Sequence, residues 1–161
     1  MKTSTLLPNE QDAEMMNIKS LDNRLSVTAQ PRLDELEQLA ARGFRTILSN
    51  RPRGENEDQP DPDALKDKAE SLSMVWHQIP VRPGEYSQAD IEAFEHILNN
   101  AQGPIVGFCR SGKRVTDLWA LSQAACRPVQ ELIEAAGAIG HDLEPLRERL
   151  EQQASQTIRR N

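Results

Sequence analysis

The feature that most constrains the fold is an alternation of short apolar runs with segments of helical period. The apolar runs lie at residues 44–49 (FRTILS), 73–81 (SMVWHQIPV) and 105–108 (IVGF). Between them, apolar residues recur at helical spacing over ten to fifteen positions. Strands joined by helices form βαβ units, which place strands in parallel with helices on both faces of the sheet. The sequence therefore predicts an α/β, three-layer domain with a mainly parallel sheet of four to five strands.

Local signals predict where the first elements begin and end. Residues 18–29 (IKSLDNRLSVTA) contain two short strand-like runs around Asp22-Asn23, which suits a two-residue hairpin turn. Pro31 suits the first position of a helix, and Gly43 suits the residue that stops it. We therefore expect a hairpin followed by a helix from Pro31 to about Gly43.

Later helices carry their own start signals. Pro62 follows Asp61 at the start of one apolar stripe, and Ser87 with Asp90 forms an S-x-x-D capping box for the next. Asp142 is placed to cap a last helix. These positions divide the chain into one continuous series of elements, with no internal repeat and no second core.

Composition limits the class of protein. With 161 residues, 37% of them hydrophobic and 27% charged, the chain suits one globular domain, which we place at 18–157 after a flexible tail at 1–17. The formal charge of −6 argues against a nucleic-acid partner, which requires a basic surface. No apolar run approaches the roughly 20 residues of a membrane helix. The sequence indicates no particular oligomeric state.

The N-terminus and the cysteines bear on location. The first residues lack the apolar block of a secretory signal, so we expect a cytoplasmic protein. Cys109 and Cys126 are too few for a disulfide framework, and two reduced thiols are expected, with a disulfide between them as the alternative. A helix between them would separate the two by roughly 20 Å, too far for Cys126 to act as a resolving thiol.

The run IVGF ends on a cysteine that is followed at once by positive charge. In parallel sheets, ligands bind at the carboxyl ends of the strands, where Cys109, Asn50 and the loop from Arg82 are expected to meet. A glycine in such a loop lets successive N–H groups point inward around an anion. The predicted anion-binding loop consists of Arg110, Ser111, Gly112, Lys113 and Arg114.

Two functional interpretations of this loop differ in chemistry. Cations and a helix N-terminus favour the thiolate form of a cysteine, which would make Cys109 a nucleophile facing a bound anion. The plainer alternative is a buried thiol beside solvated arginines.

Gly107, Gly112 and Lys113 also fit the first seven positions of a nucleotide-binding P-loop. The eighth should be Ser or Thr and is Arg114, which argues against a nucleoside triphosphatase.

The sequence resembles the bacterial beta-lactamase hydrolase-like proteins, whose fold belongs with the dual-specificity and tyrosine phosphatases. The resemblance rests on four ordered blocks and covers roughly 18–150. It implies a phosphatase-like topology, with Cys109 as nucleophile, Arg114 as anion-binding arginine and the amides of the loop as an oxyanion cradle. Members of this family are described as phosphatase-like or as sulfur transferases. The four blocks are RLSVTAQP (24–31), GFRTILSNRPRGE (43–55), HQIPVRPGEYSQADIEAF (77–94) and GPIVGFCRSGKR (103–114).

The chain departs from the phosphatase pattern in three ways. Four residues, not five, separate Cys109 from Arg114, so CRSGKR matches the C-R-x-G-x-R loop of rhodanese sulfurtransferases, which lack the IPVRPGEY block. Val115, with Thr116 one residue later, stands where phosphatases place a Ser or Thr. Arg82 stands where many place an acidic proton donor.

The remaining candidates are weaker. The nearest acid to Arg82 is Glu85, which could act as general acid or remain a solvated loop residue. Arg51 and Arg53 could recruit an anionic substrate or balance the acidic loop around them. His77 could approach the sheet end or be packed within its strand. No His or Cys pair has metal-ligand spacing, and neither a metal nor a cofactor is expected.

Three functions therefore stay open. The first is hydrolysis of phosphate esters through a cysteinyl-phosphate, with an anionic small molecule or a phosphorylated partner as substrate. The second is sulfur transfer through a persulfide on Cys109. The third is binding of an anion or a phosphorylated partner without turnover.

Overall fold

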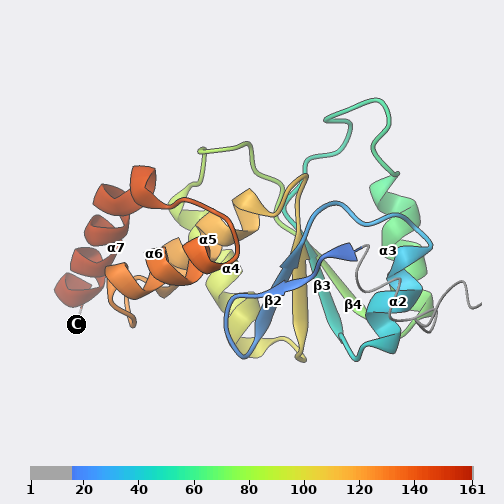
Figure 1. Ribbon diagram of the computed structural model, residues 1–161, viewed down its shortest axis with the longest axis horizontal. Helices are drawn as coiled ribbons and strands as arrows, with labels where there is room; N and C mark the ends of the chain where they lie inside the picture. Colours follow the sequence, from blue (N-terminus) through green and yellow to red (C-terminus); the bar gives the residue numbers. More distant parts are fainter. Residues whose placement is uncertain (1–15, 161) are drawn as a thin grey trace, which may run out of the picture.

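The computed structural model describes residues 16–160, which form a five-stranded sheet (Figure 1). The strand order is β1-β2-β5-β3-β4. Only β1 runs antiparallel, against β2, whereas β2, β5, β3 and β4 are parallel to their neighbours. This confirms the predicted α/β class with a mainly parallel sheet. The strands are β1 (Lys19–Ser20), β2 (Leu25–Thr28), β3 (Thr46–Ser49), β4 (Val75–Gln78) and β5 (Ile105–Phe108).

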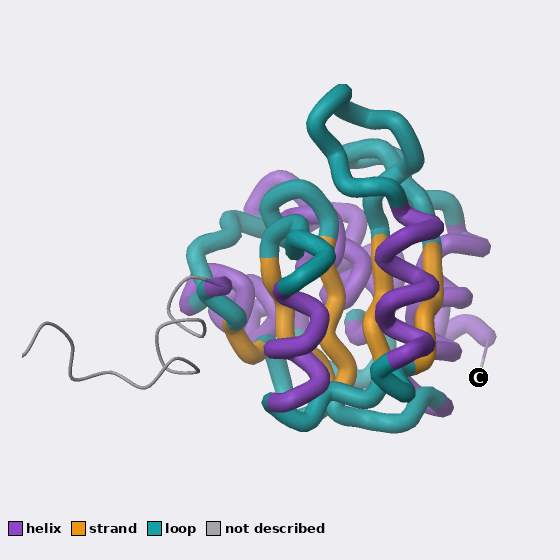
Figure 2. Tube along the Cα trace, turned by 90° about the vertical axis from the view of Figure 1, so that its right-hand side faces the viewer, coloured by secondary structure: helices purple, strands orange, loops and turns teal. Residues whose placement is uncertain are grey.

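Helices cover both faces of the sheet. On one face lie α2 (Glu35–Ala41) and α3 (Pro62–Ser71), seen in front of the strands in Figure 2. The other face is covered by the helices α4 (Gln88–Asn100), α5 (Lys113–Gln123), α6 (Val129–Ala138) and α7 (Arg147–Arg160), with the 3-10 turn η1 (Glu144–Leu146) before the last. Every residue of α5 from Arg114 to Gln123 is buried, because this helix contacts β5, α4, α6 and α7.

The central strands are buried on both sides, as expected of a parallel sheet covered by helices. In β3, Leu48 belongs to the larger apolar cluster under α4–α7, and Ile47 to the smaller one under α2 and α3. In β5, Ile105 and Phe108 divide in the same way, and Cys109 belongs to the larger cluster. The cysteine thus sits at the end of a strand that is buried at every position, on the side of α5.

Several start and stop signals are confirmed. The Asp61 side chain accepts a hydrogen bond from the Asp63 backbone N–H at 3.0 Å and begins α3. Ser87 and Asp90 form both bonds of the capping box at the start of α4. Gly43, with a φ of +98°, follows the last turn of α2.

The predicted helix start at Pro31 is wrong. The Glu35 carboxylate accepts a hydrogen bond from the Arg32 backbone N–H at 2.7 Å, which stabilises a turn, and α2 begins only at Glu35. Leu33, which lies inside the helix expected from Pro31, is 44% exposed and precedes α2. The chain therefore makes an open loop after β2.

Two other boundaries differ from expectation. The hairpin between β1 and β2 is confirmed, but its turn is longer, because Leu21 still pairs with Leu25 and Asp22 accepts the N–H groups of Arg24 and Leu25. Asp142 caps the turn η1 rather than the last helix, which starts at Arg147.

The ends of the described chain pack on the same domain. Met16 is 6% exposed and belongs to the smaller cluster, and α7 continues to Arg160. The rest of the expected tail, residues 1–15, lies outside the described residues. From residue 16 to 160, no helix is both long enough and apolar enough to cross a membrane.

Candidate active site

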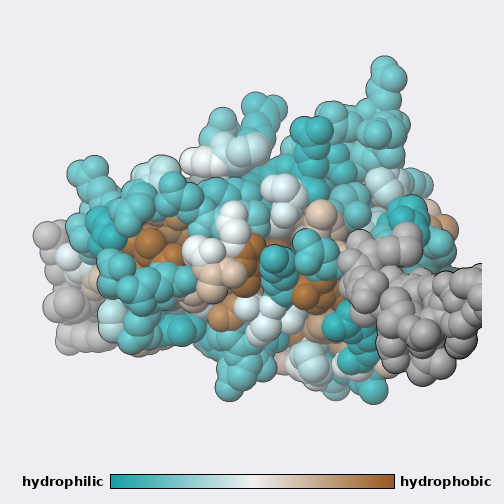
Figure 3. Space-filling view, in the orientation of Figure 1, coloured by the Kyte–Doolittle hydropathy of each residue, from teal (hydrophilic) through white to brown (hydrophobic). Residues whose placement is uncertain are grey.

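The carboxyl ends of the parallel strands are level with one another. Thr28 and Ser49 lie opposite Phe108, so the next residue of β5, Cys109, stands at the edge of the sheet. Asn50 bridges its neighbours there, donating from its backbone to Phe108 and from its side chain to Ile79. The loops that project from this edge, at the top of Figures 1 and 3, carry mainly hydrophilic residues.

The loop after β5 curls around the cysteine sulfur. Cys109 is 1% exposed, and its Sγ accepts a hydrogen bond from the Gly112 N–H at 3.1 Å. Gly112 has a φ of +96°, and a Cβ there would lie 2.8 Å from Val27 Cγ1. Only glycine satisfies both conditions, and α5 starts at the next residue with its positive end toward the loop.

Gly107 has a different role from the one a P-loop would give it. It lies inside β5, and a Cβ there would stand 2.7 Å from Val115 Cγ1. This glycine therefore lets the first turn of α5 pack against the strand. Gly107 is not part of the loop, so the match to the P-loop sequence pattern has no counterpart in the structure.

Arg114 is buried and held in one orientation. Its side chain is 5% exposed and makes an end-on pair with Glu55, at 2.8 Å from Nη1 and 3.0 Å from Nη2. Nη1 also donates to the Val81 carbonyl at 2.9 Å. These bonds use both hydrogens of Nη1 and one of Nη2. The Nε hydrogen and the second Nη2 hydrogen, on one edge of the guanidinium, have no acceptor among residues 16–160.

The surroundings of Arg114 and Glu55 favour the charged form of both side chains. The hydrogen bond from Arg114 lowers the pKa of Glu55 against the opposing effect of burial, and Arg51 adds to the lowering. Burial disfavours the charge of Arg114, but the hydrogen bond with Glu55 and the electrostatic effects of Cys109 and Glu55 outweigh it and raise its pKa. A fixed positive charge therefore lies beside the cysteine, with an unused bidentate edge.

Glu55 was not singled out from the sequence. It lies in the loop after β3, and its carboxylate also accepts from Arg51 Nε at 2.9 Å. Arg51, considered either to recruit substrate or to balance the acidic loop, is 5% exposed and donates further to Gln30 and Asn56. Arg53 pairs with Asp63 at 2.8 Å and so balances the acidic loop. A glutamate within reach of two buried arginines has no signature in sequence spacing.

A second buried network lies beside the loop and was also missed. Asp117 is 4% exposed and accepts hydrogen bonds from the Tyr86 hydroxyl and from Lys113 Nζ, both at 2.6 Å. Burial first, then Asp117 and Cys109, raise the pKa of Tyr86, so its phenol stays protonated. Arg149 of α7 donates to the Tyr86 carbonyl at 2.5 Å. The spacing of Lys113 and Asp117 by four residues was the one available signal.

Arg110 and Ser111 of the predicted anion-binding loop are exposed, and so are Arg82 and Glu85 of the loop after β4. The Ser111 hydroxyl accepts weakly from the Lys113 N–H at 3.4 Å. Arg82 and Glu85 pair through their backbones in a tight turn. Their side chains, and that of Arg110, have no hydrogen bond or ion pair with any residue in the described part of the chain.

The structure also places three further residues that were considered from the sequence. His77 is half-buried in β4, and its pKa is lowered by burial first and then by the electrostatic effect of His96 in α4. The Thr116 hydroxyl donates to the Gly112 carbonyl at 2.9 Å. Cys126 is exposed beyond the end of α5, and both cysteines are free.

Comparison with known proteins places the chain in a family. Residues 17–126 match the family model described as "Beta-lactamase hydrolase-like protein, phosphatase-like domain". The beta-lactamase hydrolase-like protein of Xylella fastidiosa strain 9a5c is 36% identical over 146 residues, a match that covers 89% of this chain and 34% of the relative. The chain thus spans about a third of the curated relatives it matches.

Solved structures agree with the family match. A candidate phosphatase from Neisseria meningitidis Z2491 is 36% identical with a TM-score of 0.78, covering 86% of this chain and 99% of that one. A kinase-associated phosphatase, 17% identical with a TM-score of 0.68 over 88% and 94% of the two chains, shares the fold. The topology is therefore that of the tyrosine and dual-specificity phosphatases, and the chain belongs to the family of beta-lactamase hydrolase-like phosphatase domains.

Proposed function

We propose that this domain hydrolyses phosphate monoesters with Cys109 as the nucleophile. The observation that carries the proposal is the position of the Cys109 sulfur. It accepts the Gly112 N–H at 3.1 Å and lies beside the fixed charge of Arg114, whose free edge matches two oxygens of a phosphate. A buried sulfur held in this way is suited to attack on a bound oxyanion.

In the first step the Cys109 thiolate attacks phosphorus, and the bond from phosphorus to the ester oxygen breaks. Arg114 holds two non-bridging oxygens through Nε and Nη2, and backbone amides of the 110–114 loop hold the third. The departing oxygen leaves as an aryl oxide or takes a proton. In the second step water attacks the cysteinyl-phosphate, the S–P bond breaks, and inorganic phosphate and the thiolate are released.

Lys113 contributes charge without touching the substrate, because Asp117 holds its ammonium group at 2.6 Å. The proton for a poor leaving group comes from Glu85. This glutamate is exposed on the turn that follows β4 and has no side-chain partner among the described residues, so it is free to swing toward the loop. Arg82, on the same turn, attracts anionic substrates toward the edge of the sheet.

One observation favours a second candidate, sulfur transfer. Four residues separate Cys109 from Arg114, Val115 follows the arginine, and the nearby Thr116 hydroxyl is bonded to the Gly112 carbonyl. No hydroxyl is thus available there to help a phosphocysteine break down. In the rival reaction the thiolate of Cys109 takes the outer sulfur of thiosulfate, sulfite leaves, and a thiophilic acceptor such as cyanide removes the sulfur.

One set of assays separates these reactions. We expect an aryl phosphate to be hydrolysed, with activity lost in Cys109→Ser and kept in Cys126→Ser. Thiosulfate-to-cyanide transfer without phosphate release would overturn the proposal in favour of sulfur transfer. Binding of phosphate with neither activity would leave an anion-binding module.

A further inference from the structure

A depression lined mainly by polar and charged residues lies beside the predicted anion-binding loop. It measures about 390 Å³ and is walled on one side by the loop after β2 and on the other by the loop after β3. Apart from two prolines, its lining residues are Gln30, Arg32, Arg51, Asn56, Asp58 and Arg110. Three arginines and one carboxylate face the same space, so the lining favours an anion.

Arg110 is the residue that connects this depression to the chemistry. It follows Cys109 directly, so a ligand held by the loop lies next to it. The guanidinium of Arg110 is exposed and has no partner among residues 16–160, whereas Arg32 pairs with Asp34 and Glu35 at 3.2 and 3.3 Å. An arginine left without a partner beside an anion site is available to hold a second anionic group.

The walls of the depression are fixed before any ligand arrives. The Gln30 N–H donates to the Arg110 carbonyl at 3.3 Å, and the Gln30 side chain accepts from Arg51 at 3.0 Å. Arg51 donates on to Asn56 at 2.6 Å, which ties the opposite wall to the same buried guanidinium. Because these contacts hold both loops, little ordering is required when a ligand binds.

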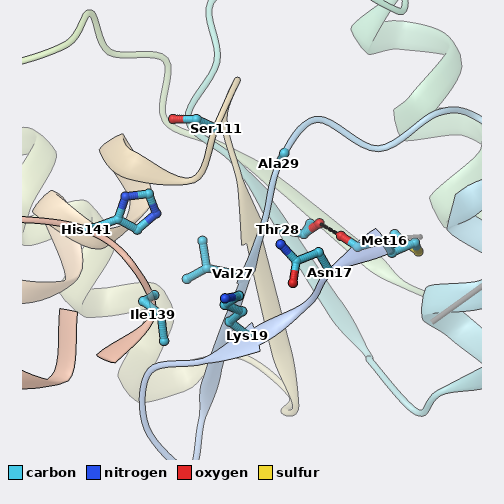
Figure 4. Close-up of a pocket in the computed structure, with 9 residues that line it drawn as sticks. All are labelled: Met16, Asn17, Lys19, Val27, Thr28, Ala29, Ser111, Ile139 and His141. Atoms are coloured by element: carbon cyan, nitrogen blue, oxygen red, sulfur yellow. Dashed lines mark hydrogen bonds between the residues drawn. The ribbon is translucent and has the colours of Figure 1, made fainter. Parts of the chain in front are cut away.

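A second depression on the other side of the loop, of about 210 Å³, is a weaker candidate (Figure 4). Ser111, His141 and Lys19 line it together with apolar residues such as Val27 and Ile139. Burial and the charge of Lys113 lower the pKa of His141, so the ring is neutral near pH 7. Lys19 is then the single full charge among its lining residues.

We propose that the depression at Arg110 binds a second phosphate group of the substrate, so that the natural substrate is a small molecule with two neighbouring phosphates, such as a diphosphate or a bisphosphate ester. This inference rests on the proposed function, because the first phosphate occupies the loop at Cys109. Arg110 provides the direct contact. Arg51 adds positive charge, Arg32 already pairs with Asp34 and Glu35, and Asp58 limits the positive charge.

The test compares the affinities of inorganic phosphate and methylenediphosphonate, which carries two anionic groups and cannot be hydrolysed, by titration calorimetry on the full chain. The measured quantity is the ratio of the two affinities, which cancels changes in the loop itself. We expect the diphosphonate to bind at least about 10-fold more tightly to the wild type. Arg110→Ala should bring the ratio close to one.

Two further variants sharpen the test. Arg45→Ala removes an equally exposed arginine just before β3, at the opposite edge of the sheet, and should leave the ratio unchanged. Asp58→Asn removes the one carboxylate that lines the depression and should raise the ratio about two- to threefold. Opposite signs at Arg110 and Asp58 cannot come from a general loss of structure.

Each contrary outcome has a distinct meaning. If phosphate binds and the diphosphonate binds no more tightly, the second subsite is wrong and the proposed function stands. If the diphosphonate is preferred but Arg110→Ala and Asp58→Asn leave the ratio unchanged, the subsite is not at Arg110 and the inference also fails. If neither anion binds, the proposed function itself fails.

Discussion

An arginine lies on each side of the loop that follows Cys109, and the two arginines differ in burial and in pairing. On the α5 side, Arg114 is 5% exposed and held by Glu55 and the Val81 carbonyl. On the other side, Arg110 is exposed and lines an open depression without a partner in the described chain. Four positions separate them. In the sequence both arginines are simply cations near a thiol. The structure shows that their surroundings differ.

The difference indicates a division of labour between fixed and free charge. A guanidinium that must meet an oxyanion in one geometry gains from being oriented in advance, since no reorganisation is then needed during reaction. A guanidinium that recognises variable substrates does not need this constraint. We therefore expect changes on the Arg114 side to alter turnover, and changes on the open side to alter affinity or substrate choice.

Arg114→Lys should have the largest effect. Lysine keeps the positive charge but loses the planar edge that matches two phosphate oxygens. We expect kcat/KM for an aryl phosphate to fall by about 10²- to 10³-fold. Steady-state kinetics measure this, with Arg45→Lys as the matched control. A loss of less than about threefold would mean that the free edge of Arg114 is not used.

Glu55→Gln tests the residue that orients Arg114. The amide keeps the shape but loses the charge and offers one acceptor in place of two, so the guanidinium is less well fixed. We expect kcat to fall about 10-fold with a smaller change in KM. Glu57→Gln, in the same loop with an exposed side chain, should behave as the wild type. Equal kinetics of both variants would contradict the orienting role.

The same pair predicts a dependence of stability on pH. The pKa of Glu55 lies below its ordinary value of 4.5 in the folded protein, so its pairing stabilises the fold fully above that value. This contribution is lost as the pH falls through the lowered pKa. Urea unfolding should therefore show that the wild type loses more free energy of unfolding on acidification below about pH 5 than Glu55→Gln does.

Tyr86→Phe tests how the loop after β4 is anchored. It removes one of the two hydrogen bonds to the buried Asp117 carboxylate while keeping the ring. We expect the free energy of unfolding to fall by about 1.5–3 kcal/mol. The aryl phosphatase kcat should change little. A large loss of kcat without loss of stability would instead give Tyr86 a direct part in the chemistry.

Glu85→Gln should have the smallest effect on an activated substrate. An aryl oxide leaves without a proton, so its rate should change less than about twofold, whereas an alkyl phosphate should slow about 10-fold. The comparison of the two substrates in one variant is the informative quantity. If both rates stay unchanged, Glu85 is a solvated loop residue and takes no part in proton transfer.

The fold was largely predictable because it follows from local patterns. The period of the apolar residues predicted the strands and helices, and Asp61 and Ser87 began their helices as expected. The start of α2 was not predictable from Pro31, since the Glu35 side chain stabilises a competing turn. At this position the helix-starting proline competes with the turn that Glu35 stabilises. The apolar periodicity along the chain does not decide between them.

The site was predictable only where it is continuous in sequence. The curl of the loop around Cys109 and the position of Gly112 follow from adjacent residues. Glu55 is 59 residues away from Arg114, and Tyr86 is 31 residues away from Asp117, so both contacts depend on the finished fold. Arg51 was considered as a residue that recruits substrate. In the structure its guanidinium instead donates to Glu55 in its own loop.

The central claim is that the loop presents the Cys109 sulfur, beside an oriented arginine, to a bound oxyanion. The most direct test is the rate of iodoacetamide alkylation of Cys109 at about pH 7 with and without phosphate, read by mass spectrometry beside that of the exposed Cys126 in the same chain. We expect phosphate to slow the alkylation of Cys109 and to leave that of Cys126 unchanged. Equal alkylation rates of Cys109 with and without phosphate would contradict the claim.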